Sequence, residues 1–283
     1  MAALIAFCLL GMVLSFVLGY VVTARPAGAG TGAVVRLRTA RAQLDRTLGP
    51  FGSFVVFLGA GTFLVTAVCL PLGELCQRLL KAHDVPMFDL AQRHVRPGAF
   101  TDTMKLITQS GNVWQTRYVG LGAAIVLTLV ALRLRRRPWV PVVLIGLVIL
   151  VERFQQTGLA KLVDRGHPPT TLGTYPSGGC ARLISIYGVI VLITLTYLRA
   201  GPRTRAIVWG ALAAFAFLEG YTRWHLSKHW ITDVYAGWIY GYLLLAVAVF
   251  AGRSLLAERG DGDGDAGSSA DGEREPVRAA SGG

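Results

Sequence analysis

Long apolar runs separated by short polar segments dominate the sequence. Most of these runs approach the 20 residues that a helix needs to cross the hydrocarbon core of a bilayer. Only helices and closed barrels satisfy every backbone polar group inside lipid, and runs of this length are helical. The pattern therefore predicts an all-α polytopic membrane helix bundle with seven spans. The runs cover about residues 2–23, 52–72, 118–133, 138–159, 183–198, 206–220 and 234–252.

Basic residues gather on one predicted side of this bundle. Arginines fill the segments 24–50, 133–137 and 199–205 and recur at Arg253, and all of these connections fall on the same side when the spans alternate. Cytoplasmic loops carry such an excess of arginine and lysine. We therefore expect these segments in the cytoplasm and the N-terminus outside, with 24–50 as a cytoplasmic loop.

The composition supports a membrane protein and no nucleic-acid partner. Hydrophobic residues make up 53% of the chain, charged residues 16%, and the mean hydropathy is +0.51. A net charge of +12 would suit nucleic acid, but the arginines lie in loops and no recognition motif accompanies them. Residues 254–283 consist largely of Gly, Asp, Glu and Ser, which predicts a disordered cytoplasmic tail.

Three polar segments fall on the side opposite the arginines. Residues 73–117 mix both charge signs with Pro86 and Pro97, which predicts short amphipathic helices at the outer face. Residues 160–182 are rich in Gly, Pro and Thr and lack periodicity, which predicts an irregular loop. The third segment, 220–233, joins the last two spans.

The segment 220–233 holds side chains that carry phosphate chemistry. Arg223 is a fixed cation that can hold phosphate oxygens in a fork of donors. His229 precedes Asp233 by four residues, one turn of a helix. A carboxylate so placed can orient one imidazole nitrogen and aim the other at a substrate.

Two other interpretations of this segment remain open. His225, His229 and Asp233 could line one helix face as metal ligands, although no further His or Cys pair accompanies them. The same residues could also anchor a helix end at the membrane interface, where polar and aromatic side chains collect.

The motif Thr222-Arg223-x5-His229-x3-Asp233 resembles the third signature of the type 2 phosphatidic-acid phosphatases. These are integral-membrane enzymes that form a phosphohistidine intermediate. Pro176-Ser177-Gly178-Gly179 is similar to their second signature, P-S-G-H, and Asp164-Arg165-Gly166-His167-Pro168 is similar to the D-R-P-R-P form of the first. The resemblance covers about residues 84–252.

The resemblance implies a role for each matching residue and requires neither a metal nor a cofactor. His229 would attack phosphorus, and Asp233 would orient and charge its imidazole. The remaining matched residues would bind the phosphate oxygens of the substrate: Lys161, Arg165, His167, Ser177, Gly178 and Arg223.

Two positions depart from the family pattern. Gly179 replaces a histidine that protonates the leaving oxygen, and His167 stands where the family has arginine. Without that acid, cleavage of a monoester loses a catalytic contribution of about 10²–10⁴-fold. A diphosphate expels phosphate, which is stable as an anion near neutral pH. We therefore expect a preference for diphosphates, which Gly179→His should reduce.

These inferences define the predicted organisation and function. Residues 1–50 form an N-terminal transmembrane helix with its basic loop, 51–253 form a six-span phosphatase-like domain, and 254–283 form the tail. The predicted activity is hydrolysis of a lipid phosphate, or preferably a prenyl or other lipid diphosphate, at the extracytoplasmic face of the cell membrane. One alternative is an inactive relative that binds or carries a phospholipid headgroup, and the other is a metal-dependent protein built on His225 and His229. The sequence leaves the lipid, the oligomeric state and the role of the first helix open.

Overall fold

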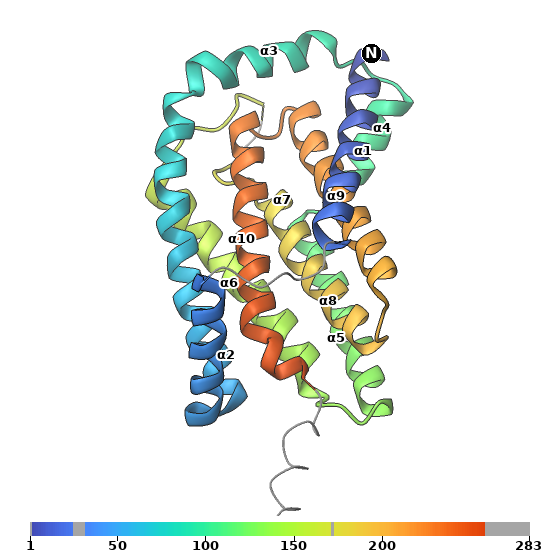
Figure 1. Cartoon of the computed structure of the whole chain (residues 1–283). Helices are drawn as coiled ribbons and strands as arrows, with labels where there is room; N and C mark the ends of the chain where they lie inside the picture. The colour runs from blue at the N-terminus through green and yellow to red at the C-terminus, as the bar shows by residue number, and fades with distance from the viewer. Residues whose placement is uncertain (1, 25–31, 171–172, 258–283) are drawn as a thin grey trace, which may run out of the picture.

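The computed structural model describes residues 2–24, 32–170 and 173–257 (Figure 1). Over these residues the chain forms helices and no strand, so the predicted all-α class is confirmed. The α-helices are α1 (Ala2–Ala24), α2 (Gly32–Arg78), α3 (Val85–His94), α4 (Ala99–Ile107), α5 (Val113–Arg133), α6 (Trp139–Val163), α7 (Gly178–Arg182), α8 (Gly188–Tyr197), α9 (Pro202–His225) and α10 (Ile231–Leu256); Leu80–Asp84 and Leu183–Tyr187 are π-helical.

Six helices in the described part of the chain are long and apolar enough to cross a membrane. They are α1, α2, α5, α6, the continuous stretch Gly178–Tyr197, and α10. The seventh predicted run, 206–220, lies in α9, which has 24 residues and stands among the other long helices (Figure 1). Both ends of α9 carry charged side chains, including Arg203 and Arg223, so its composition alone does not mark it as a span.

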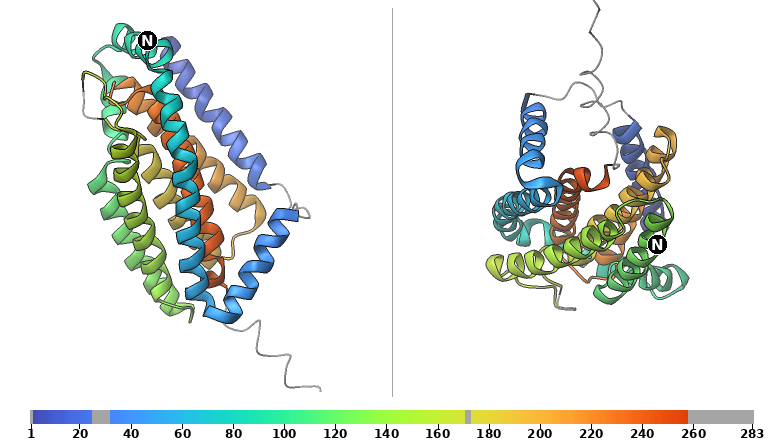
Figure 2. Two further views of the ribbon diagram at one scale, coloured as in Figure 1. Left: turned by 90° about the vertical axis from the view of Figure 1, so that its left-hand side faces the viewer. Right: turned by 90° about the horizontal axis from the view of Figure 1, so that it is seen from below.

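The helices differ in how much of their surface meets protein. Only 6% of the most apolar window of α1 is buried, against 50% for α10 and 67% for Gly178–Tyr197. Figures 1 and 2 show α10 running through the middle of the bundle and α1 at its edge. Helix α1 therefore faces lipid over most of its length, whereas α10 and the α7–α8 stretch form the interior that supports the site.

Small residues bring α1 close to α9. A β-carbon on Gly19 would lie 2.9 Å from the β-carbon of Ala213, and one on Gly210 would lie 2.9 Å from the carbonyl oxygen of Phe16. Close approach of this kind gains van der Waals contact, which drives helix association in lipid. The extra N-terminal helix is thus packed against the helix that carries Arg223.

The basic segment predicted as a loop is largely helical. Residues 32–48 continue into α2, and the prediction of a loop is wrong over this part. Arginine, leucine and alanine are strong helix formers, so a basic composition does not exclude a helix. The chain bends at Gly49 (φ 72°, ψ 169°), directly before Pro50. Residues 25–31 and the predicted tail from residue 258 lie outside the described residues.

The two ends of the bundle differ in character, as the sequence predicts. Helices α3 and α4 confirm the expected short helices and lie at one end, beside the turn between α9 and α10 (Figure 1). The turn between α5 and α6, which carries residues 134–137, lies at the opposite end. The candidate signatures and the arginine-rich connections therefore occupy opposite ends of the molecule.

Candidate active site

Arg223 is held in the interior near the end of α9 by three acceptors. Its Nε donates to Oε1 of Glu219 at 2.7 Å, and its Nη2 donates to the carbonyl oxygen of Thr108 at 2.8 Å and to Oδ1 of Asn112 at 3.1 Å. The hydroxyl of Ser110 donates to the other oxygen of Glu219 at 3.2 Å. The guanidinium is thus fixed in one orientation before any ligand arrives.

Two glycines let guanidinium groups lie directly against the backbone of 176–179. A β-carbon on Gly179 would lie 2.5 Å from Cζ of Arg223, and one on Gly178 would lie 2.7 Å from Nη1 of Arg182. There is no room for a side chain at 179 while Arg223 keeps its place. This contact gives a steric reason for glycine where the resembling family has histidine. An imidazole at 179 would have to displace Arg223, so the substitution Gly179→His does not simply add a proton donor.

Arg182 is a second interior cation, one that the sequence motifs do not single out. Its Nε donates to the carbonyl oxygen of Gly111 at 3.0 Å, and its Nη1 lies 3.4 Å from Oε1 of Glu152. Arg182 follows Gly178 by one helical turn, in the short helix α7. The turn 176–179 therefore has an arginine on each side of its glycines.

His229 lies in the turn between α9 and α10, before the first residue of α10. Its ring is partly exposed, but Nδ1 is buried and has no hydrogen-bond partner within the described residues. A β-carbon on Gly173 would lie 3.0 Å from this Nδ1. Nδ1 of the imidazole therefore faces the chain at Gly173.

The surroundings of His229 favour its neutral form. Burial lowers the pKa of its imidazole to about 3, and the positive charges of Arg223, Arg182 and Lys228 add to this effect. The imidazole is therefore neutral and nucleophilic at neutral pH. The same three cations create a positive electrostatic potential, which attracts an anionic phosphate group.

The structure places the Asp233 carboxylate against Arg165. Oδ1 of Asp233 accepts a hydrogen bond from Nη1 of Arg165 at 2.8 Å. Its backbone carbonyl accepts one from the amide of Ser177 at 2.9 Å. In the described part of the chain no hydrogen bond joins Asp233 to His229. The two residues do not share a helix, because α10 begins between them at Ile231, so the expected one-turn relation is not formed.

Ser177 supplies an unused hydroxyl at the centre of this arrangement. Its side chain is buried, and its Oγ has no hydrogen-bond partner among the residues that the structure describes. A buried hydroxyl without a partner costs free energy unless a ligand or water satisfies it. Together with the buried Nδ1 of His229, it gives this end of the bundle two buried polar atoms that a ligand could satisfy.

Arg165 connects the irregular loop to α10 through side-chain hydrogen bonds. It donates to both carboxylates, Asp84 and Asp233, and to the hydroxyl of Thr232 at 2.6 Å. Thr232 in turn donates its amide and its hydroxyl to Asp84 at 3.0 and 2.8 Å. With the guanidinium engaged in this way, Arg165 fits a positioning role better than direct contact with a phosphate.

Lys161 and His167 are exposed on the surface of the same region. Nδ1 of His167 donates to the carbonyl oxygen of Pro168 at 2.9 Å, within its own loop. No hydrogen bond or ion pair in the described residues joins either side chain to Arg223 or Ser177. The structure thus brings together Arg223, Ser177, Gly178 and His229 of the predicted site, and places Lys161 and His167 outside this group.

A first prediction follows from the buried network of Arg165. Arg165→Gln leaves the carboxylates of Asp84 and Asp233 buried without their cation, which typically costs about 3–5 kcal/mol. We expect a marked fall in thermal stability in detergent. Lys161→Gln removes the same charge from an exposed position and should leave stability within about 0.5 kcal/mol of the parent. Equal melting curves for the two variants would contradict the assigned role.

The metal alternative finds little support in the arrangement of His225. Its Nε2 lies 3.2 Å from the hydroxyl of Thr101, and its Nδ1 lies 3.5 Å from the hydroxyl of Tyr221. The ring also packs against Phe100. Within the described residues, no group of three or more His, Cys, Asp or Glu side chains is placed to hold a metal ion. His225 thus serves the packing of α4 against α9.

Comparisons with known proteins identify the fold. Residues 117–253 match the model of the PAP2 superfamily. The structure is similar to the crystal structure of a transmembrane PAP2-type phosphatidylglycerolphosphate phosphatase from Bacillus subtilis, with a TM-score of 0.58 and 20% sequence identity. The match covers 66% of this chain and 93% of that one. No curated protein sequence matches the chain. The resemblance drawn from the motifs is thereby confirmed.

Proposed function

Because the chain carries the PAP2 superfamily match and has the fold of a membrane PAP2-type phosphatase, we propose that it hydrolyses a lipid phosphate or diphosphate with His229 as nucleophile. The observation that carries the proposal is the placement of His229 before α10, within the field of the two guanidinium groups that lie against Gly178 and Gly179, those of Arg182 and Arg223. A nucleophile and a cationic cradle are the two parts that phosphoryl transfer requires.

In the proposed reaction, Nε2 of His229 attacks phosphorus as the bond to the leaving oxygen breaks, and that oxygen departs with the electron pair. Arg223, Arg182 and the hydroxyl of Ser177 stabilise the charge on the phosphoryl oxygens, where most of the catalytic gain arises. Water then attacks the phosphohistidine, releasing phosphate and restoring His229. Asp233 takes part through Arg165 and through its carbonyl contact with Ser177.

The substrate class that we propose is a lipid diphosphate, such as a prenyl diphosphate. Gly179 has no proton to give, and the guanidinium of Arg223 fills the space beside it. A guanidinium stays protonated, so it stabilises charge but does not donate a proton to a leaving alkoxide. A leaving phosphate needs no such proton. The site therefore suits diphosphates better than monoesters.

The experiment that tests this function measures phosphate release by the purified protein from a lipid diphosphate and from phosphatidic acid, with excess chelator present. We expect turnover of both, with a larger kcat/KM for the diphosphate by about 10²-fold, the lower end of the range for a missing general acid. Equal kcat/KM values would show that another group protonates the leaving oxygen. Loss of turnover in chelator would refute a metal-independent reaction.

Because Gly179 supplies no proton donor, one alternative remains open. In this alternative the protein binds a phospholipid headgroup without cleaving it. The same assay separates the two functions. Saturable binding of both lipids with no phosphate release above that of a His229→Gln control would favour the carrier.

We also propose that the site faces the extracytoplasmic side of the cell membrane, since the arginine-rich connections lie at the other end. The four native cysteines are buried and free, so they give little labelling background. We expect an impermeant thiol reagent to label Lys161→Cys in intact cells and Arg133→Cys only after permeabilisation. The reverse result would place the site in the cytoplasm.

A further inference from the structure

The turn between α4 and α5, residues 108–112, contacts both arginines of the candidate site. It belongs to none of the three motifs and precedes the part of the chain that matches the PAP2 superfamily. The carbonyl oxygen of Thr108 accepts a hydrogen bond from Nη2 of Arg223 at 2.8 Å. The carbonyl oxygen of Gly111 accepts one from Nε of Arg182 at 3.0 Å. One short turn therefore holds two cations that come from different helices, α9 and α7.

The turn offers its carbonyl groups to these cations because of its place after α4. The last carbonyl groups of a helix have no partner within the helix and carry partial negative charge. Thr108 directly follows α4, and its carbonyl is one of these acceptors. The amides of the turn are used locally, since Thr108 donates to Met104 at 3.0 Å and Ser110 donates to Ile107 at 2.9 Å. Helix α4 thus ends with its negative pole at Arg223.

Asn112 serves Arg223 and not its own helix. It stands directly before α5, at the position where an asparagine side chain usually caps the helix. Its side chain makes no such cap bond. Oδ1 of Asn112 instead accepts a hydrogen bond from Nη2 of Arg223 at 3.1 Å. Helix α5 therefore forgoes a local stabilising contact, and the side chain orients the guanidinium.

Gly111 lies between the carboxylate that orients Arg223 and the glycine turn against which Arg223 rests. A β-carbon at position 111 would collide with Oε1 of Glu219 and lie 2.7 Å from the carbonyl oxygen of Gly179. The same Oε1 accepts the hydrogen bond from Nε of Arg223 at 2.7 Å. A change of shape at Gly111 would therefore disturb an acceptor of each arginine, Glu219 for Arg223 and its own carbonyl for Arg182.

We propose that residues 108–112 are a positioning element for phosphoryl transfer, which sets the guanidinium groups of Arg182 and Arg223 where the phosphoryl oxygens require them. It rests on the proposed function, since it assigns both arginines to one phosphoryl group. Charges that are oriented in advance stabilise a transition state without reorganising during the reaction. A displacement of about 1 Å can cost about 10²-fold in rate. In this role the turn contacts the arginines and not the substrate.

The test measures the binding of orthovanadate, an analogue of the transferred phosphoryl group, to the full-length protein in detergent by titration calorimetry. Unfolded protein changes the stoichiometry of binding but not the dissociation constant, so a loss of stability alone does not mimic the effect. Asn112→Leu should weaken binding by about tenfold, the loss of one charge-assisted hydrogen bond. Gly111→Ala should weaken it by about 10²-fold, because it disturbs both arginines. Asn112→Asp keeps an acceptor oxygen and should stay within about threefold of the parent.

The same variants should change turnover more than substrate binding. We expect kcat for the lipid substrate to fall in the order of the vanadate affinities, with KM changed less than about threefold. An interaction that acts mainly in the transition state gives this division between kcat and KM.

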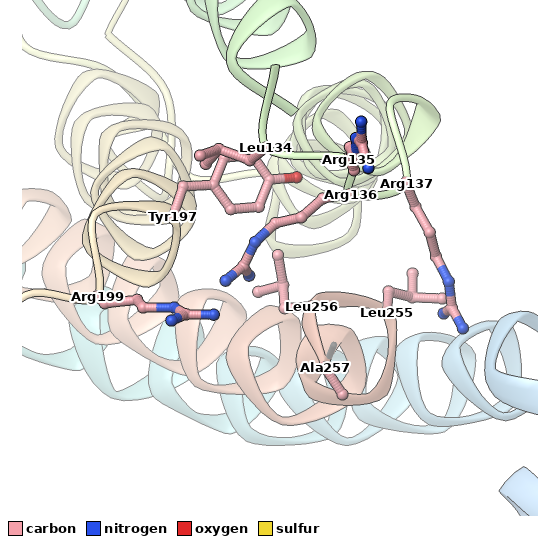
Figure 3. Close-up of a pocket in the computed structure, with 9 residues that line it drawn as sticks. All are labelled: Leu134, Arg135, Arg136, Arg137, Tyr197, Arg199, Leu255, Leu256 and Ala257. Atoms are coloured by element: carbon pink, nitrogen blue, oxygen red, sulfur yellow. The ribbon is translucent and has the colours of Figure 1, made fainter. Parts of the chain in front are cut away.

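Two controls accompany these variants. Gly122→Ala adds the same methyl group to α5 where nothing lies within 4 Å, and it should leave the dissociation constant unchanged. Arginines also line a pocket at the other end of the bundle (Figure 3), where an oxyanion could collect. Arg137→Gln removes one of those charges and should likewise leave the dissociation constant unchanged.

The outcomes separate this proposal from the proposed function. Active variants Gly111→Ala and Asn112→Leu that bind vanadate as the parent does would overturn the positioning role and leave hydrolysis intact. Equal losses in Asn112→Leu and Asn112→Asp would also overturn it, because a retained acceptor should hold Arg223. A loss in Arg137→Gln alone would show an adventitious ion only. The expected pattern of vanadate binding without phosphate release from lipid would support the positioning of the arginines and refute hydrolysis.

Discussion

Replacing His229 by glutamine is expected to reduce phosphate release by about 10⁴-fold or more. Removal of the nucleophile from a catalytic group that acts as a unit costs this much or more in well-studied hydrolases. Glutamine keeps a polar side chain of similar length in the turn between α9 and α10 but cannot form the covalent intermediate. The measurement is kcat with saturating lipid diphosphate.

The matched control for this variant is His225→Gln, four residues earlier. His225 contacts Thr101 and Tyr221 and takes no part in the proposed chemistry. It should lose stability but keep kcat within about tenfold of the parent at a temperature where both are folded. A similar loss of kcat in both variants would mean that the fold, and not the nucleophile, explains the effect.

Gly179→Ala is expected to lower kcat/KM by about 10²-fold, the effect of misplacing one preorganised charge at a phosphoryl-transfer site. The added methyl group would lie 2.5 Å from Cζ of Arg223. The guanidinium must then leave the position that Glu219, Thr108 and Asn112 define. Gly179→His should lower kcat/KM at least as much as Gly179→Ala does. The loss should be similar for monoesters and diphosphates.

Two controls tie this result to Arg223. Gly166→Ala adds the same methyl group to the irregular loop, where nothing lies within 4 Å, and should leave activity unchanged. In an Arg223→Lys background, Gly179→Ala should add little further loss, because the two changes act on one contact. Fully additive losses would show that Gly179 acts independently of the guanidinium.

The sequence predicts the membrane bundle well because each span is indicated by a long run of apolar residues. Apolar runs near 20 residues and the one-sided arginines fix the spans and the two ends of the molecule. The failure at 32–48 has a clear origin. A basic segment was expected to be a loop, yet its residues favour a helix, and only Gly49 breaks the run.

The sequence predicts only part of the site. A motif gives the spacing of residues along the chain, but it does not give the directions in which their side chains point in the fold. Arg223 and His229 lie together as the motif implies, but the i, i+4 spacing of His229 and Asp233 has its helical meaning only inside one helix. Arg182 and Asp84 belong to no motif quoted from the sequence. Arg182 could have been suspected from its position one helical turn after Gly178, whereas nothing near Asp84 signals its pairing with Arg165 across 81 positions.

The proposed nucleophile can be tested directly by trapping the intermediate. Purified protein mixed briefly with a lipid diphosphate labelled in its terminal phosphate should be quenched in alkali, digested and analysed by mass spectrometry. The account predicts a phosphate on the peptide that contains His229, formed as fast as turnover and absent from His229→Gln. Steady turnover with no label on His229, or with the label on another residue, would contradict it.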